Sequence, residues 1–484
     1  MASERNYTEL LPNEVLCMVF DRLDEMSVKN ASRTCKRWNN IIFHSEYVQR
    51  FQVNISAFSY AALKINVTKS LLPKAQELAH TDRRYRNFWF VIMEGMEQDA
   101  EPIWKILHPK HTSNMYALYL NYINASMMTL FLTVIDAIPS MTQLRSLGAL
   151  DVITVRHKNY QDIRQENIPL IRSRSIQELT MYCKYKYTID MPELKVFKGA
   201  LSGLILPDGG DGESLVLAKL QHLSVTVESW QSVGQSFFRR IPNVVKIEWD
   251  IPVTDGIFLA MCNALPSLIE ARFSKELVLS RRHLLDELSR LTQLRRLSFY
   301  LINMQHDVFL DLSKLTLLEE LDLGFTHLMP ITLLSLSKTI KKFGVHITGD
   351  NKQSLMEIIA RNLTQLTELR LACYPAPLST SVLNALPSLE QLEVLVFSHG
   401  QFTQSFFLEM KAPMRRLHTL RFQHCQLESK QLLGLQDKFP NLKNPEFVEC
   451  KLISDESKGG SGQTQGIQEI MAAFADRLKA AFQS

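Results

Sequence analysis

The chain repeats a short pattern of apolar residues at nearly regular intervals. The pattern is apolar-x-x-apolar-x-apolar, and its first positions are Met115, Leu144, Ile176, Leu194, Leu220, Val244, Leu268, Leu294, Leu318, Ile340, Leu366, Leu392, Leu417 and Leu442. From Leu220 onward, consecutive matches are 22 to 26 residues apart. Single matches arise by chance in a chain that is 46% hydrophobic. A sustained period of this length indicates a repeat architecture.

Each repeat is predicted to form one short strand and one returning helix. In residues 320–324, two leucines alternate with other residues, as in a strand that buries one face. In residues 280–291, leucines recur at helical spacing. No unit can bury its apolar face alone, so the units must stack with their strands in parallel. The sequence therefore predicts an α/β fold, a curved solenoid with parallel strands on its concave face and helices on its convex face.

The period and the strand pattern resemble a leucine-rich-repeat array covering residues 115–452. The pattern is most regular from Leu220 to Phe447. Gly199 and Pro445 occupy apolar positions in their units, and residues 389–397 fit two registers. The Asn or Cys that often caps the strand turn in this family is mostly absent, although Cys425 and Cys450 stand at the matching place.

The chain before residue 51 follows a different pattern. Residues 10–23 predict a helix begun by proline, with Leu11, Val15, Val19 and Leu23 on one face and Leu16 and Phe20 on the adjoining face. Residues 27–34 and 35–42 predict a second and a third helix. A unit this small is marginal alone. One apolar face is therefore expected to dock a partner or the array.

Three motifs in this segment resemble the F-box: Leu11-Pro12-x-Glu14-Val15-Leu16, then Val19-Phe20-x-x-Leu23, then Cys35-Lys36-Arg37-Trp38. With residues 8–50 as an F-box followed by the repeats, the chain resembles an F-box and leucine-rich-repeat protein. In that family the F-box binds the Skp adaptor of a cullin-based ubiquitin ligase, and the repeats hold a substrate. The resemblance implies adaptor contacts by Leu11, Pro12, Val15, Leu16, Val19, Phe20 and Trp38. The alternative is that Val15, Val19, Leu23 and Trp38 fill the F-box's own core.

The residues between the buried leucines of each strand should face the concave surface. The resulting substrate-binding candidates are Lys246, Glu248, Asp250, Arg272, Arg296, Tyr300, Asp322, Lys342, Arg370 and Arg421. Acidic and basic residues are mixed along this surface. A nucleic-acid groove would need a row of basic residues, so the pattern favours a protein partner.

No motif for catalysis or metal binding is found. The sequence lacks the phosphate-binding loop, the Gly-x-Ser-x-Gly elbow and the His-Glu-x-x-His helix, and its cysteines form no Cys-x-x-Cys pair. Pro109 separates His108 from His111, and Asp208–Glu213 lacks the ligand spacing of a calcium loop. A non-catalytic protein without cofactor or metal is expected, and its contribution would be to bring reactants together.

The remaining segments are assigned by composition. Residues 51–114 predict irregular connecting or first repeat units, 453–466 a flexible linker, and 467–484 an amphipathic helix that either caps the array, folds on a partner or self-associates. No secretory signal and no membrane-spanning run is seen. A net charge of +4 among 54 basic and 50 acidic residues selects no partner. Scattered cysteines read as reduced thiols, in keeping with a cytoplasmic or nuclear protein without membrane contact.

The sequence thus predicts the substrate-recognition subunit of a Skp-cullin-F-box ubiquitin ligase. Its F-box would dock the Skp adaptor and through it a cullin, and its repeats would bind a protein substrate. The alternative is a leucine-rich-repeat interaction scaffold outside any ligase, whose amino-terminal helices pack internally.

Overall fold

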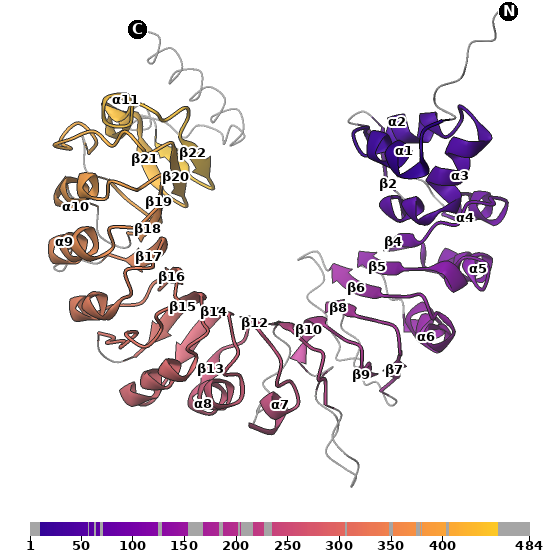
Figure 1. Ribbon diagram of the computed structural model, residues 1–484, viewed down its shortest axis with the longest axis horizontal. Helices are drawn as coiled ribbons and strands as arrows, with labels where there is room; N and C mark the ends of the chain where they lie inside the picture. Colours follow the sequence, from indigo (N-terminus) through magenta and orange to yellow (C-terminus); the bar gives the residue numbers. More distant parts are fainter. Residues whose placement is uncertain are drawn as a thin grey trace, which may run out of the picture. The chain divides into compact units, whose positions relative to one another are not determined.

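The computed structural model describes residues 10–453 with internal gaps (Figure 1). Outside the description are residues 1–9, 57, 62–63, 68–70, 124–127, 153–167, 183–186, 202–203, 205–215, 227–234, 305–306, 348–351, 374–377, 379, 403–405 and 454–484. The predicted carboxy-terminal helix, almost all of the predicted linker and the Asp208–Glu213 segment therefore lie outside the described residues.

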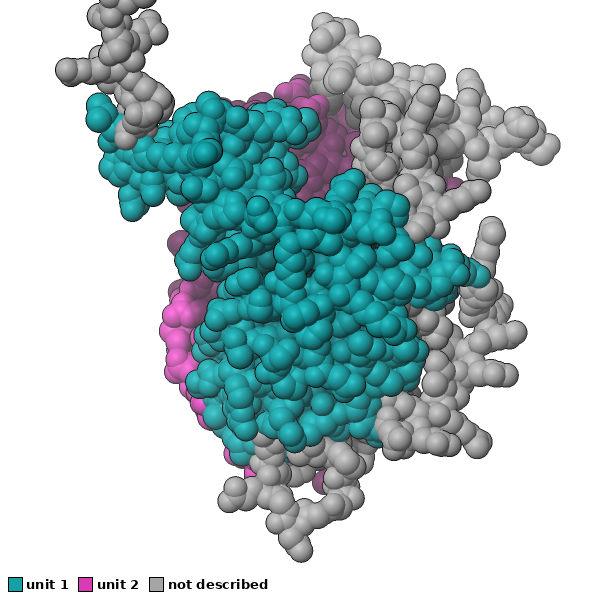
Figure 2. All heavy atoms as spheres, turned by 90° about the vertical axis from the view of Figure 1, so that its right-hand side faces the viewer, with its two compact units in different colours: residues 1–231, 240–242 teal, residues 232–239, 243–484 magenta. Residues whose placement is uncertain are grey.

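The chain divides into two compact units. Unit 1 comprises residues 1–231 and 240–242, and unit 2 comprises residues 232–239 and 243–484. Figure 2 shows unit 1 in teal and unit 2 in magenta. Each unit contains part of the repeat array and is described by itself.

Unit 1 begins with three short helices, α1 (Asn13–Phe20), α2 (Glu25–Ala31) and α3 (Lys36–His44), and a 3-10 turn, η2 (Glu46–Arg50). Pro12 precedes α1, where the missing amide hydrogen of proline costs no helical hydrogen bond. Helix α2 begins earlier than the sequence predicted because the Asp24 side chain accepts a hydrogen bond from the Ser27 amide at 2.7 Å and caps the helix. The Cys35 side chain accepts from the Trp38 amide and caps α3 in the same way.

The rest of unit 1 forms a parallel sheet covered by helices. Its strands are β1 (Gln52–Ser56), β4 (Asn87–Met93), β5 (Ala117–Ile123), β6 (Ser146–Val152), β8 (Glu178–Tyr182), β10 (Val196–Ala200) and β11 (His222–Thr226), each paired in parallel with the next. Helices α4 (Leu72–Ala79), α5 (Glu97–Leu107) and α6 (Met128–Ala137) lie on the outer side of these strands (Figure 1). The hairpin β2–β3 (Phe58–Ala61, Lys64–Val67) and the pair β7–β9 (Leu170–Arg172, Thr188–Asp190) are additional. The ladder thus begins at β1, within the segment 51–114 that the sequence left open between connecting and first repeat units.

Unit 2 continues the same architecture. Its parallel strands are β12 (Lys246–Trp249), β13 (Val253–Thr254), β14 (Glu270–Val278), β15 (Arg296–Asn303), β16 (Glu320–Asp322), β17 (Lys342–His346), β18 (Glu368–Ala372), β19 (Val394–Ser398), β20 (Thr419–Gln423) and β22 (Glu446–Val448), with the pair β21–β23 (Gln426–Glu428, Lys451–Ile453) beside them. Within this unit the strands line the concave side and the helical segments the convex side (Figure 1). The fold is a leucine-rich-repeat-like solenoid, as predicted.

The helical segments of unit 2 are short. They are α7 (Gln235–Arg239), α8 (Asp255–Ala264), η6 (Arg282–Arg290), η7 (Pro330–Ser335), α9 (Lys352–Asn362), α10 (Thr380–Ala385), η9 (Leu386–Ser388), η10 (Ser429–Leu432) and α11 (Leu435–Lys438). Two further 3-10 turns, η3 (Thr112–Asn114) and η4 (Ile138–Ser140), belong to unit 1. No helix within the described ranges has the length and apolar character needed to cross a bilayer.

Equivalent apolar positions of successive coils face one another across the ladder. Leu297 pairs with Leu321 and Leu321 with Phe343, and all three side chains are at most 2% exposed. Further along, the rings of Phe397 and Phe422 stack with centroids 5.8 Å apart. The array core is therefore a continuous stack in which each coil covers the next.

The irregular coils are accommodated by local contacts. Residues 389–397 adopt the register with Leu395 opposite Leu369. The thiol of Cys425 donates to the carbonyl oxygens of Phe397 and Gln423 at 3.4 and 3.3 Å. Cys450 donates likewise to Phe422 at 3.2 Å. These two cysteines therefore occupy the turn-capping place that the sequence assigned to them, and both are free thiols.

Gly324 shows where the ladder tolerates no side chain. Its φ is +51°, and a Cβ there would collide with the carbonyl oxygens of Phe299 and Tyr300 in the preceding coil. Glycine alone adopts this conformation without steric cost. Gly324 therefore lets two coils approach closely just beyond β16.

We expect Gly324→Ala to lower the free energy of unfolding by about 2–4 kcal/mol, because positive φ and the collision with backbone add. Urea unfolding followed by circular dichroism measures the change. Gly256→Ala is the matched control, since no atom lies within 4 Å of a Cβ built at this helical glycine. The control should change stability by less than about 1 kcal/mol. Equal unfolding midpoints for the two variants would contradict the prediction.

Candidate functional site

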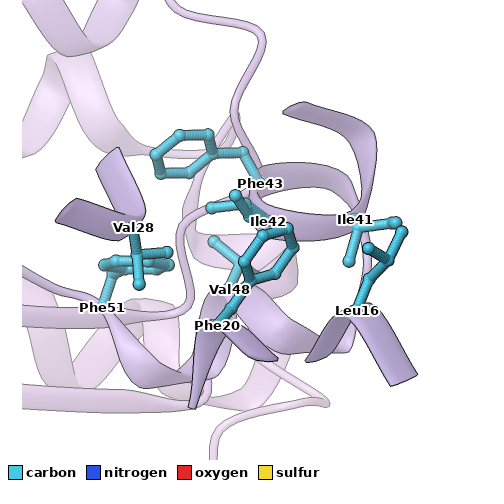
Figure 3. Packing of buried hydrophobic residues seen from close by; sticks show 8 residues of the cluster. All are labelled: Leu16, Phe20, Val28, Ile41, Ile42, Phe43, Val48 and Phe51. Atoms are coloured by element: carbon cyan, nitrogen blue, oxygen red, sulfur yellow. The ribbon is translucent and has the colours of Figure 1, made fainter. Parts of the chain in front are cut away.

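The amino-terminal helices enclose a small apolar core. Its buried members are Leu16, Phe20, Val28, Ile41, Ile42, Phe43, Val48 and Phe51, which converge between the helices in Figure 3. The ring of Phe20, fully buried, meets Trp38 edge to face at 5.2 Å and Tyr47 at 5.9 Å. Burial raises the pKa of Tyr47 to about 12, so its hydroxyl stays neutral. The module is therefore folded around its own core.

Helix α1 carries two apolar stripes, of which one is buried and the other is exposed. Residues 16 and 20 are four apart, so their side chains lie one turn above each other and point into the core. Val15, Met18 and Val19 lie on the neighbouring stripe, where they are 37%, 67% and 47% exposed. Leu10, Leu23 and Met26, which lie before and after α1, are exposed as well, and these six apolar residues are here called the α1 patch.

Arg37 of α3 ties down the start of α1. Its guanidinium donates to the carbonyl oxygen of Leu11 and to the Asn13 side-chain oxygen, the latter at 2.9 Å from Nη2. These bonds hold the Leu11-Pro12 turn against α3. The α1 patch is thus presented on a braced helix.

The predicted adaptor residues divide between surface and core. Pro12, Val15 and Val19 are exposed, Leu11 is half-buried against the core, and Trp38 is half-buried against Phe20. Leu16 and Phe20 differ from the sequence expectation, because they are at most 2% exposed and have no surface to offer a partner. Leu10, Met18, Leu23 and Met26 belong to the exposed face instead. The i, i+3, i+4 spacing of residues 15, 18 and 19 is the sequence pattern that would have found Met18.

On the concave side of unit 2, most of the charged strand residues are joined by ion pairs within a strand or between nearby strands. Lys246 contacts Glu248 at 2.9 Å and Glu270 at 3.2 Å, and Arg296 reaches the second oxygen of Glu270 at 2.9 Å. Hydrogen bonding to Glu248, with Glu270 adding to it, raises the pKa of Lys246. Further pairs are Lys342–Glu320 at 3.0 Å, Arg370–Asp322 at 3.5 Å, Arg421–Glu446 at 2.6 Å and Lys275–Asp250 at 3.7 Å.

Arg272 and Glu368 are charged strand residues that stand outside this network. Arg272 on β14 is exposed, and Glu368 on β18 is half-buried. Neither has an ion-pair partner among the residues that the structure describes. These two side chains are available for a partner molecule.

The structure brings most of the predicted substrate residues to two adjoining hollows in unit 2. The first, of about 250 Å³, is lined by charged residues that include Arg272, Arg296, Asp322, Lys342 and Arg370. The second, of about 510 Å³, shares Arg272, Asp322 and Arg370 and adds Tyr300. Four predicted residues line neither hollow: Lys246, Glu248, Asp250 and Arg421.

The second hollow contains residues that the sequence prediction missed. Phe325, His399 and His424 line it, and none lies at a strand position used for that prediction. They follow the strands, at the turn. Burial, with the neighbouring His424, lowers the pKa of His399. In the described part of the chain, no three His, Cys, Asp or Glu side chains are grouped to hold a metal ion.

Comparison with known proteins identifies the amino-terminal module. The family described as F-box-like matches residues 8–51. Residues 8–51 form an F-box-like domain. A relative, F-box only protein 48 of Mus musculus, is 48% identical over 44 residues, which is 9% of this chain and 27% of that protein. The chain therefore shares only a minor part of its length with this relative.

The comparison with solved structures found a weak similarity. The solved structure titled "Crystal structure of TLR13-ssRNA13 complex" has a TM-score of 0.42 and 14% identity, covering 83% of this chain and 55% of that chain. The assignment of the F-box-like domain rests on sequence similarity. The assignment of the solenoid rests on the strands and registers of this chain.

We expect the two stripes of α1 to respond differently to truncation. Phe20→Ala empties the centre of the F-box-like core and should destabilise the domain by about 3–5 kcal/mol. Met18→Ala removes a side chain that is 67% exposed and should change stability by less than about 0.5 kcal/mol. Amide hydrogen exchange across residues 13–51 of the full chain measures both. Equal exchange rates in the two variants would show that Phe20 is not a core residue.

Proposed function

We propose that this chain is the substrate-recognition subunit of a Skp-cullin-F-box ubiquitin ligase. Its F-box-like domain docks the Skp adaptor, which carries the cullin, and the concave face of unit 2 holds a protein substrate. The observation that carries the proposal is the α1 patch on a domain already folded around its own core. The chain contributes proximity and no chemistry of its own.

The α1 patch has the physical character of a docking surface. Met18 and Met26 are 67% and 74% exposed, and Leu10 is 74% exposed. Fully burying one such side chain is worth about 1.5–3 kcal/mol. Contiguous apolar surface on a soluble domain marks an interaction site. An apolar groove on a helical adaptor would cover it.

The concave face of unit 2 supports a protein substrate. Its acids and bases are interleaved and paired, so it presents no row of cations to a phosphate backbone. Mixed charges of this kind give orientation and specificity against another protein. A substrate bound there would be held by the same chain that docks the adaptor.

We expect Val19→Asp to weaken capture of purified Skp adaptor by the full chain at least tenfold, since a charge would enter an apolar contact. Val19 is 47% exposed and outside the core, so the substitution leaves the fold intact. Leu11 is a poorer choice because it packs against the core and would mix folding with binding.

Val216→Asp is the matched control, because Val216 is 50% exposed and lies outside α1. This variant should bind the adaptor as the natural chain does. Circular dichroism confirms that both variants are folded. Failure of the natural chain to bind, or equal binding by Val19→Asp, would overturn the proposed function.

A further inference from the structure

The second hollow of unit 2, here called the aromatic hollow, is lined by strand residues and by the turns that follow three of the strands. Its lining includes Arg272, Tyr300, Phe325, Arg370, His399 and His424, and its volume is about 510 Å³. These residues come from coils spread over more than a hundred residues of sequence. Parallel stacking brings them together because equivalent positions of successive coils are neighbours.

Phe325 is the centre of an aromatic cluster that is separate from the array core. Its ring lies 5.5 Å from Tyr300, 5.7 Å from His346 and 5.0 Å from His399, in each case edge to face. His399 in turn stacks on His424 at 4.8 Å. The core rings of these coils, such as Phe299, border the hollow but are buried, with Phe299 only 1% exposed.

The cluster leaves aromatic surface open to a ligand. Tyr300 is 48% exposed and Phe325 is half-buried. An exposed ring beside other rings offers edge-to-face or offset contact to an incoming aromatic side chain. The hollow is open to solvent and is lined by side chains from several strands. A side chain that projects from a protein segment can enter it, whereas a flat protein surface cannot.

Arg272 gives the hollow its charge preference. Lys246, Arg296, Lys342 and Arg370 each contact a carboxylate of this chain. Arg272 is exposed and has no such contact within the described ranges. Its guanidinium can therefore form a bidentate pair with a carboxylate from outside.

The register sets the distance between the two features. Arg272 lies on β14, and Phe325 follows β16, two strands away. Arg272 is level with Asp322 of β16, and Phe325 stands three residues past Asp322, so an offset along the chain adds to the two strand spacings of about 10 Å. About three to four residues of an extended chain, with the reach of their side chains, cover this separation. An aromatic residue and an acidic residue about three positions apart would reach both.

We propose that the aromatic hollow binds an extended acidic segment of the substrate protein. An aromatic side chain of the segment packs against Tyr300 and Phe325, and an Asp or Glu about three residues away pairs with Arg272. This inference rests on the proposed function and specifies the substrate class of the concave face. Ser298, which is half-buried and also lines the hollow, supplies a hydroxyl for the segment's backbone.

The test uses arrays of immobilised decapeptides probed with the full chain. Each decapeptide has Trp at one fixed position, Glu, Lys or Ala three residues away, and mixed residues elsewhere. A second set replaces Trp by Ala. We expect the Trp–Glu peptides to retain at least tenfold more protein than the Trp–Lys or Ala–Glu peptides.

Charge reversal distinguishes specific pairing from general attraction. Arg272→Glu should shift the preference from Glu to Lys, and Tyr300→Ala should reduce the preference for Trp at least fivefold. Arg282→Glu is the matched control, because Arg282 is an exposed arginine of η6 in the same coil and does not line the hollow. It should leave both preferences unchanged.

Equal retention of the Trp–Glu and Trp–Lys peptides, or an unchanged preference in Arg272→Glu, would overturn the inference. Adaptor capture by the F-box-like domain is measured separately and does not depend on Arg272. A chain that captures the adaptor but shows no peptide preference would refute the aromatic hollow alone. A chain that fails to capture the adaptor would refute the proposed function.

Discussion

The structure depends on the burial of each coil's strand residues against the next coil. A single strand such as β16 has one apolar face and no second layer of its own, so its leucines are covered only when neighbouring coils align in register. The stacked rings of Phe273 and Phe299, 5.2 Å apart, and of Phe422 and Phe447, 5.4 Å apart, show this alignment along the array. Stability is therefore shared between neighbours, and a defect such as a side chain at Gly324 acts on two coils at once.

The same alignment determines the concave surface. Strand geometry points every second side chain away from the core, and parallel register then places those side chains in rows. Most charged members of the rows neutralise one another across strands, as Glu270 does between Lys246 and Arg296. Arg272, which has no ion-pair partner in the described part of the chain, therefore differs from its neighbours. The array prepares a surface on which a few unpaired groups and one aromatic cluster can define specificity.

The F-box-like domain follows a different constraint. Its core is small, and α1 must serve both the core and the exposed face. Successive residues of an α-helix are rotated by roughly 100° about its axis. The stripe of Val15 and Val19 is therefore about 100° around α1 from the stripe of Leu16 and Phe20. Leu16 and Phe20 fill the core of the domain, whereas Val15, Met18 and Val19 remain exposed for a partner. Neighbouring residues of one helix thus serve folding and docking. A substitution that tests docking must therefore be made at an exposed residue of α1.

The sequence by itself determined the repeat, the strand positions within it, the three amino-terminal helices and the capping role of Cys425 and Cys450. These features are local or periodic, and periodicity states directly which side chains share a face. Tertiary structure alone decided that Leu16 and Phe20 are core residues, because both stripes of α1 are apolar and only the packing of α2 and α3 selects one. It alone gathered Phe325, His399 and His424, since their contacts join coils and turns whose separation in the chain no local pattern relates. It alone also left Arg272 without an ion pair among the described residues, because an ion pair across strands depends on the reach of side chains in neighbouring coils.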